Sequence, residues 1–154
     1  MKSIVLRFIP VLLRMVVIFN LSASSDPYQA VLPSHWQSTC QRFLSSSNLA
    51  PLLCQDDAVG NTSHVLEYTI LAFLWVRALL STNKPLTQNK RFLLFAILFS
   101  MLYALSDETH QLFVPGRAFQ LLDLSLDLTG TLLGITLAWF ILRNRSSSLI
   151  VPNS

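Results

Sequence analysis

Four long apolar stretches set narrow limits on how this chain can fold. They run over about residues 4–21, 64–81, 92–106 and 121–142 of the 154. A helix needs about 20 apolar residues to cross the hydrocarbon core of a bilayer, so each stretch approaches the length of one crossing. The sequence therefore predicts an all-α membrane protein, built as a bundle of four transmembrane helices, with little chain left for a separate soluble domain.

The composition supports the bilayer as the environment of the chain. Hydrophobic residues make up 52% of the sequence, charged residues make up 12%, and the mean hydropathy is +0.51, which is unlike a soluble domain. The net charge is +3, but no basic patch is interleaved with aromatic residues, as nucleic-acid binding would require. We therefore expect the lipid bilayer as a partner and no nucleic acid.

The first apolar stretch has two interpretations. Lys2 gives it a basic start, and residues 21–23 are a passable cleavage site, so it could be a cleaved signal peptide. Arg14 lies in the middle of the stretch and argues against cleavage, because an intramembrane Arg costs about 3 kcal/mol unless it faces another helix or an interface. We favour a retained anchor.

The chain then divides into four parts. Residues 1–21 form the first transmembrane helix, 22–63 an extracytoplasmic loop, 64–145 a core with three transmembrane helices, and 146–154 a disordered tail. The third apolar stretch is short for a crossing unless its helix continues into the polar residues that follow. A Pro-Gly pair at residues 115–116 then signals a turn.

The basic residues predict the orientation, because short cytoplasmic loops hold an excess of Lys and Arg. Eight of the eleven basic residues flank one side of the predicted spans. These eight are Lys2, Arg7, Arg77, Lys84, Lys90, Arg91, Arg143 and Arg145. The opposite loops keep only Arg42 and Arg117. Both termini are therefore expected to be cytoplasmic, with residues 22–63 and 107–120 outside.

The carboxylates gather on the other side of the predicted membrane. All eight fall in outer loops or at outer span ends: Asp26, Asp56, Asp57, Glu67, Asp107, Glu108, Asp123 and Asp127. The insertion rule says little about Asp and Glu. This segregation therefore calls for a separate explanation, and a site under the outer surface is one.

Helical spacing brings several of these side chains onto shared faces. His64, Glu67 and Tyr68 stand at i, i+3 and i+4, and Asp123 and Asp127 are one turn apart. If the third helix continues beyond its apolar part, it brings further polar side chains to the same depth in the membrane. The predicted ligand-binding residues are His64, Glu67, Tyr68, Asp107, Glu108, Gln111, Arg117, Asp123 and Asp127.

Structural roles compete with this hypothesis. Gly130 and Gly134 form a G-x-x-x-G pattern, which we interpret as a surface for close helix packing. Glu67 and Asp127 each lie about a turn inside an apolar stretch, where ionisable residues are functional candidates by default. A purely structural ion pair with Arg117 or Arg14 is the alternative for both acids.

The two cysteines also admit two interpretations. Cys40 and Cys54 both lie in the predicted outer loop. An oxidising compartment would allow them to form a disulfide. Two unpaired thiols in a loop packed on the membrane are an equally good interpretation, so the pairing stays open.

The segment DETHQLFVPGRAFQLLDLSLDLTGTLLG, residues 107–134, resembles the signature of the VanZ-like family. These are small bacterial membrane proteins named for a teicoplanin-resistance accessory protein. The shared pattern is an acidic pair, a Gln, a Pro-Gly-Arg turn, an Asp and a Gly-x-x-x-Gly. Residues 63–75 also resemble the family's second span, and the end of the first stretch supports a retained anchor. The departure is Asp127, where the family usually has Asn.

The resemblance implies a role in the bacterial cell envelope, in the plasma membrane, with reduced sensitivity to teicoplanin-type glycopeptides as the family's best-known phenotype. One hypothesis is an accessory protein whose outer pocket of acids and Arg117 binds an envelope lipid, a cell-wall precursor or a partner protein. The planar guanidinium would contact phosphate or carboxylate, and its acidic neighbours would orient it.

The alternative hypothesis is an intramembrane enzyme acting on a lipid-linked substrate. Asp107 or Glu108 would be the general base, and His64 or His110 a proton shuttle or metal ligand. Imidazoles and carboxylates would suit a divalent metal, yet no tight ligand spacing singles one out. Transport is weaker still, because four short spans form little pathway. The sequence leaves open the cofactor, the metal and the oligomeric state.

Overall fold

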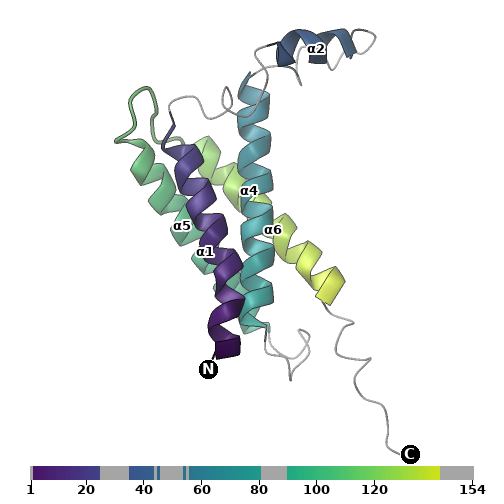
Figure 1. Ribbon diagram of the computed structural model, residues 1–154, viewed down its shortest axis with the longest axis vertical. Helices are drawn as coiled ribbons and strands as arrows, with labels where there is room; N and C mark the ends of the chain where they lie inside the picture. Colours follow the sequence, from purple (N-terminus) through teal and green to yellow (C-terminus); the bar gives the residue numbers. More distant parts are fainter. Residues whose placement is uncertain are drawn as a thin grey trace, which may run out of the picture.

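The protein is an α-helical bundle in the computed structural model, which describes residues 2–24, 35–43, 45, 54, 56–80 and 90–142. Within these ranges every regular element is a helix: α1 (Lys2–Ser22), α2 (Trp36–Phe43), α4 (Asp56–Leu79), α5 (Arg91–Gln111) and α6 (Leu121–Leu142). The predicted disordered tail at 146–154 lies outside the described residues. Figure 1 shows the short α2 beside the end of the bundle where α4 begins.

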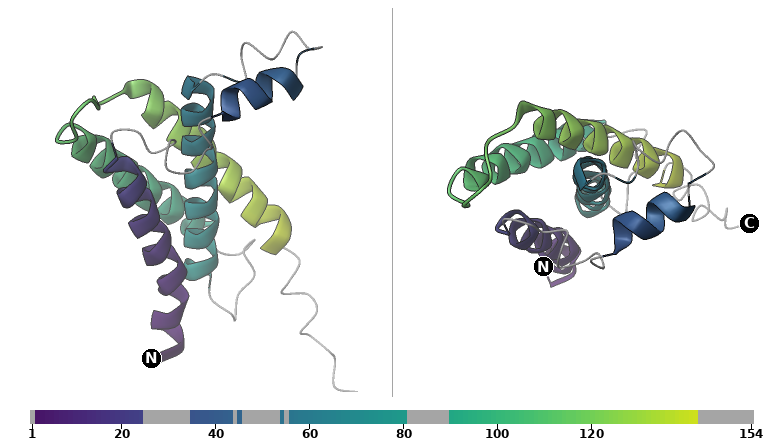
Figure 2. Two further views of the ribbon diagram at one scale, coloured as in Figure 1. Left: turned by 45° about the horizontal axis from the view of Figure 1, so that its top comes forward. Right: turned by 90° about the horizontal axis from the view of Figure 1, so that it is seen from above.

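α4 is the central helix of the bundle. It packs against α1, α5 and α6, and its contact with α6 is the most extensive. Seen from above, α4 stands between α1 on one side and the antiparallel pair of α5 and α6 on the other (Figure 2). Tyr68, Leu71, Ala72 and Val76 are fully buried along it. The face of α4 that bears the predicted site residues is thus turned toward neighbouring helices.

Three of the described helices are long and apolar enough to cross a membrane: Val5–Ser22 within α1, Arg91–Gln111 and Leu121–Leu142. The prediction of four such spans is corrected at α4. This helix has 24 residues, but His64, Glu67 and Arg77 lower the hydropathy of its apolar part. Its neighbours bury much of that part, so its sequence is under less pressure to be apolar than a lipid-facing helix.

The helix bounds differ from the predicted divisions in two places. α4 begins at Asp56, inside the region expected to be a loop ending at residue 63. α5 continues to Gln111, beyond the apolar stretch that ends at 106. The second difference places Asp107, Glu108 and Gln111 on a helix that is packed in the bundle.

A disulfide joins Cys40 of α2 to Cys54, with Cα atoms 5.8 Å apart. Cys54 is buried. The bond ties α2 to the chain just before α4 begins.

Candidate functional site

Buried polar side chains gather at one end of the bundle, where α5 ends and α6 begins. We call this group the polar cluster: His64, Asp107, Glu108, Gln111, Asp123 and Asp127, each no more than 7% exposed. Ionisable side chains are costly to bury within a membrane bundle unless they are paired or hydrogen-bonded. The concentration of four carboxylates in one place therefore needs a physical account.

His64 links α4 to the two acids of α6. Its Nδ1 lies 2.9 Å from Oδ1 of Asp127, and its Nε2 lies 3.6 Å from Oδ2 of Asp123. The one-turn spacing of the two acids places them on either side of a single imidazole ring. His64 is thus oriented by carboxylates at both ring nitrogens.

Close approach of α4 and α6 makes this contact possible. A Cβ atom at Gly130 would overlap the backbone oxygen of Val65, and one at Gly134 would overlap that of Thr69. The Thr69 hydroxyl also donates to the backbone oxygen of Gly130, at 3.1 Å. The two glycines therefore pack against α4, as small residues do between membrane helices.

Gln111 connects the acids of α5 to the following turn. Its amide nitrogen donates to Oε1 of Glu108 at 3.0 Å and weakly to Oδ2 of Asp107 at 3.4 Å. Its amide oxygen accepts from Nε and Nη2 of Arg117, at 3.2 and 2.9 Å. The one buried amide of Gln111 thus bridges the guanidinium and two carboxylates by hydrogen bonds.

The turn between α5 and α6 closes over the cluster. Gly116 has a φ of 79°, a left-handed conformation that glycine adopts at little cost. After this reversal the backbone N–H of Gln120 donates to Oε2 of Glu108, at 2.9 Å. Both oxygens of Glu108 are therefore hydrogen-bonded, one within α5 and one across the turn.

Several buried oxygens have no partner within the described residues. They include Oδ2 of Asp127, Oδ1 of Asp107 and the hydroxyl of Tyr68. Asp127 and Tyr68 are both 0% exposed. Among the described residues, His64 is the only basic residue that pairs with the acids of the cluster; no Lys or Arg does so. The cluster consequently contains more carboxyl groups than basic partners among the described residues.

Three members of the cluster could hold a metal ion. His64, Glu108 and Asp127 each offer one ligand atom, and these atoms lie within 4.8 Å of one another. They come from α4, α5 and α6. The helical packing, not local sequence spacing, brings them together.

The remaining predicted site residues lie at the margin of the cluster. Arg117 is half-buried and bonds to Gln111, so the expectation that acidic neighbours orient it is wrong. Glu67 is also half-buried. Tyr68 lies within the bundle and is 0% exposed.

Two hydrogen-bond partners of the cluster are not predicted from the sequence. The Ser22 hydroxyl, at the end of α1, donates to Oδ2 of Asp107 at 2.7 Å. The backbone of Gln120 donates to Glu108. Ser22 is 85 residues away from Asp107, and no periodicity couples positions so far apart. A backbone donor leaves no sequence signal at all.

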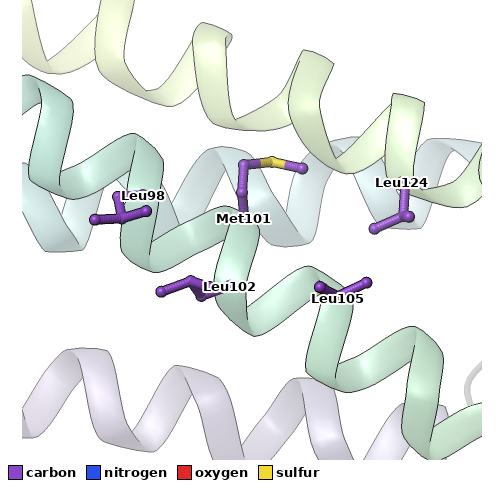
Figure 3. A pocket seen from close by; sticks show the side chains of 5 residues that line it. All are labelled: Leu98, Met101, Leu102, Leu105 and Leu124. Carbon is purple, nitrogen blue, oxygen red and sulfur yellow. The ribbon is translucent and has the colours of Figure 1, made fainter.

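An apolar groove lies between α5 and α6 beside the cluster. It has a volume of about 320 Å³ and is lined by Leu98, Met101, Leu102, Leu105 and Leu124. Figure 3 shows four of these side chains on α5, with Leu124 pointing from α6 toward them. Helical spacing continues the α5 wall from Leu105 to Glu108. We call this feature the apolar groove; its α5 wall ends at Leu105, three residues before Glu108.

Comparison with known proteins finds one family. No curated protein and no solved structure matches the chain. The family model described as VanZ/LLP1 matches residues 6–143, which include most of α1, the polar cluster and the apolar groove. The chain therefore belongs to the VanZ/LLP1 family.

Proposed function

We propose that this VanZ-type membrane protein is an accessory protein of the bacterial cell envelope that binds an envelope lipid or lipid-linked cell-wall precursor between α5 and α6. The observation that supports this function is the apolar groove, whose α5 wall ends three residues before Glu108. A ligand there has a long apolar chain at one end and an anionic head group at the other.

Arg117 is the natural contact for the head group. It sits half-buried beyond the cluster and directs Nε and Nη2 to Gln111. Its Nη1 has no hydrogen bond within the described residues, so this nitrogen is available to a phosphate oxygen. The bond to Gln111 fixes the planar guanidinium in advance, which lowers the entropic cost of binding an anion.

Binding is favoured over catalysis by the closure of the cluster. Glu108 and Asp127 are 0% exposed, and His64 is 7% exposed. Oε1 and Oε2 of Glu108 are both hydrogen-bonded. A general base must come within hydrogen-bond reach of the proton that it removes, and this arrangement leaves little room for a substrate.

The lipid proposal predicts that filling the apolar groove reduces lipid retention. Leu105→Trp places a larger side chain in the groove, and Arg117→Ala removes the head-group contact. Each variant is expected to retain about tenfold less lipid, equivalent to about 1.4 kcal/mol of binding free energy. Native mass spectrometry after extraction in mild detergent measures the bound lipid.

Leu94→Trp is the matched control, since Leu94 lies on α5, is 66% exposed and does not line the groove. If Leu105→Trp and Leu94→Trp retain equal amounts of lipid, the groove is not the binding site. Where production of the wild type lowers teicoplanin sensitivity of a bacterial host, Leu105→Trp should abolish the effect and Leu94→Trp should preserve it.

The proposed orientation places the end of the bundle that holds the polar cluster outside and the opposite end in the cytoplasm. Its support is the distribution of basic residues. With Cys40 and Cys54 replaced, single cysteines at positions 30 and 118 should react with an impermeant thiol reagent from outside. A cysteine at position 87 should react only after permeabilisation. The opposite labelling pattern would contradict the orientation.

A further inference from the structure

A triad of buried side chains within the polar cluster has the composition of a cation site. His64, Glu108 and Asp127 come from three different helices, and their potential ligand atoms lie within 4.8 Å of one another. Metal–ligand bonds of about 2.0–2.2 Å place neighbouring ligand atoms roughly 3–4 Å apart. Small side-chain rotations would bring the triad to that separation.

Two unsatisfied oxygens provide a second, independent indication of a ligand. Oδ2 of Asp127 is buried and has no hydrogen-bond partner within the described residues, and the same is true of the Tyr68 hydroxyl. Both side chains are 0% exposed. An ionised buried oxygen without a partner costs more than a neutral one. A cation at the triad would compensate Asp127 directly.

We propose that His64, Glu108 and Asp127 bind one divalent transition-metal ion, Zn²⁺ or Mn²⁺. The ligands would be one imidazole nitrogen and two carboxylate oxygens. Mg²⁺ and Ca²⁺ prefer sites built from oxygen alone, whereas imidazole favours transition metals and Zn²⁺. This site goes beyond the proposed lipid binding and does not depend on it.

Asp123 completes the environment expected around such a ligand. A metal-binding histidine commonly directs its other ring nitrogen to a carboxylate, which fixes the ring orientation. His64 faces Asp127 with Nδ1 and Asp123 with Nε2, so either nitrogen has a carboxylate beside it. Asp123 thus acts as a positioning residue through His64.

The test measures metal in the full chain purified in mild detergent. Elemental analysis should find about one Zn²⁺ or Mn²⁺ per chain, and removal with a chelator should lower the melting temperature. Adding back ZnCl₂ or MnCl₂ should restore it, because a ligand that binds only the folded state stabilises that state. Absence of bound metal together with no thermal shift from either salt overturns the proposal.

Two isosteric variants locate the site. Asp127→Asn and Glu108→Gln each remove one anionic ligand and are expected to weaken metal binding at least about tenfold. Ser125→Ala is the control on α6, since Ser125 is exposed and bonds only within its own helix. Wild-type affinity in both isosteric variants would overturn the proposal. A thermal shift that MgCl₂ or CaCl₂ produces while ZnCl₂ and MnCl₂ produce none would also overturn it. If neither variant folds, the metal content of the wild type decides.

Discussion

Gly134→Ala is expected to destabilise the bundle by about 3 kcal/mol or more, at the upper end of overpacking effects. The added methyl group would overlap the backbone oxygen of Thr69 on α4 and would also lie 3.1 Å from Cβ of Ala72. Backbone atoms cannot move aside as a flexible side chain can, so the two helices must separate. That separation would also loosen the contact of His64 with Asp127.

Reversible unfolding in mixed detergent measures this loss of stability. Thr136→Ala is the control, because Thr136 is exposed on the same helix and bonds only to Leu132. It should remain within about 0.5 kcal/mol of the wild type. Wild-type stability of Gly134→Ala would show that α4 and α6 are not packed this closely.

Gln111→Leu is the second substitution with a large expected effect, about 3 kcal/mol of lost stability. Leucine keeps much of the volume but removes the donor to Oε1 of Glu108 and Oδ2 of Asp107. Leaving a buried carboxylate without its donor costs more than a hydrogen bond contributes when it is present. The same change releases Arg117 from its acceptor.

Arg117→Ala provides the comparison, with an expected loss of about 1 kcal/mol. Arg117 is half-buried and bonds to the neutral amide of Gln111, whereas Gln111 is 0% exposed. Unfolding of both variants in the same detergent gives the order of the two effects. A greater loss for Arg117→Ala would mean that the guanidinium charge, and not the amide, holds the cluster together.

The sequence predicts the elements of this fold better than their ends. α6 occupies the range of the fourth apolar stretch because its lipid-facing surface demands apolar residues throughout. α5 extends beyond its apolar part, since donors from α1 and the α5–α6 turn form hydrogen bonds with Asp107 and Glu108. A hydropathy scale counts only the free-energy cost of burying these acids. It does not count the hydrogen-bond donors that offset this cost.

The candidate site was predictable where one helix carries several of its members. The period of the helix predicts that His64 and Tyr68 share one helix face and that Asp123 and Asp127 share another. Which faces meet depends on packing between helices, and so the partner of Arg117 was assigned incorrectly. The binding role of the whole set stays a prediction.

The bond between Ser22 and Asp107 bears on how the protein is made. α1 leaves the ribosome first, while its polar partner on α5 is synthesised 85 residues later, and the acids of α6 follow last. No portion of the chain that ends before Asp127 contains every group of the cluster. A nascent chain stopped before α6 would leave His64 without either of its carboxylates. Truncated products that end before α6 would therefore carry polar groups whose partners in the native protein are missing.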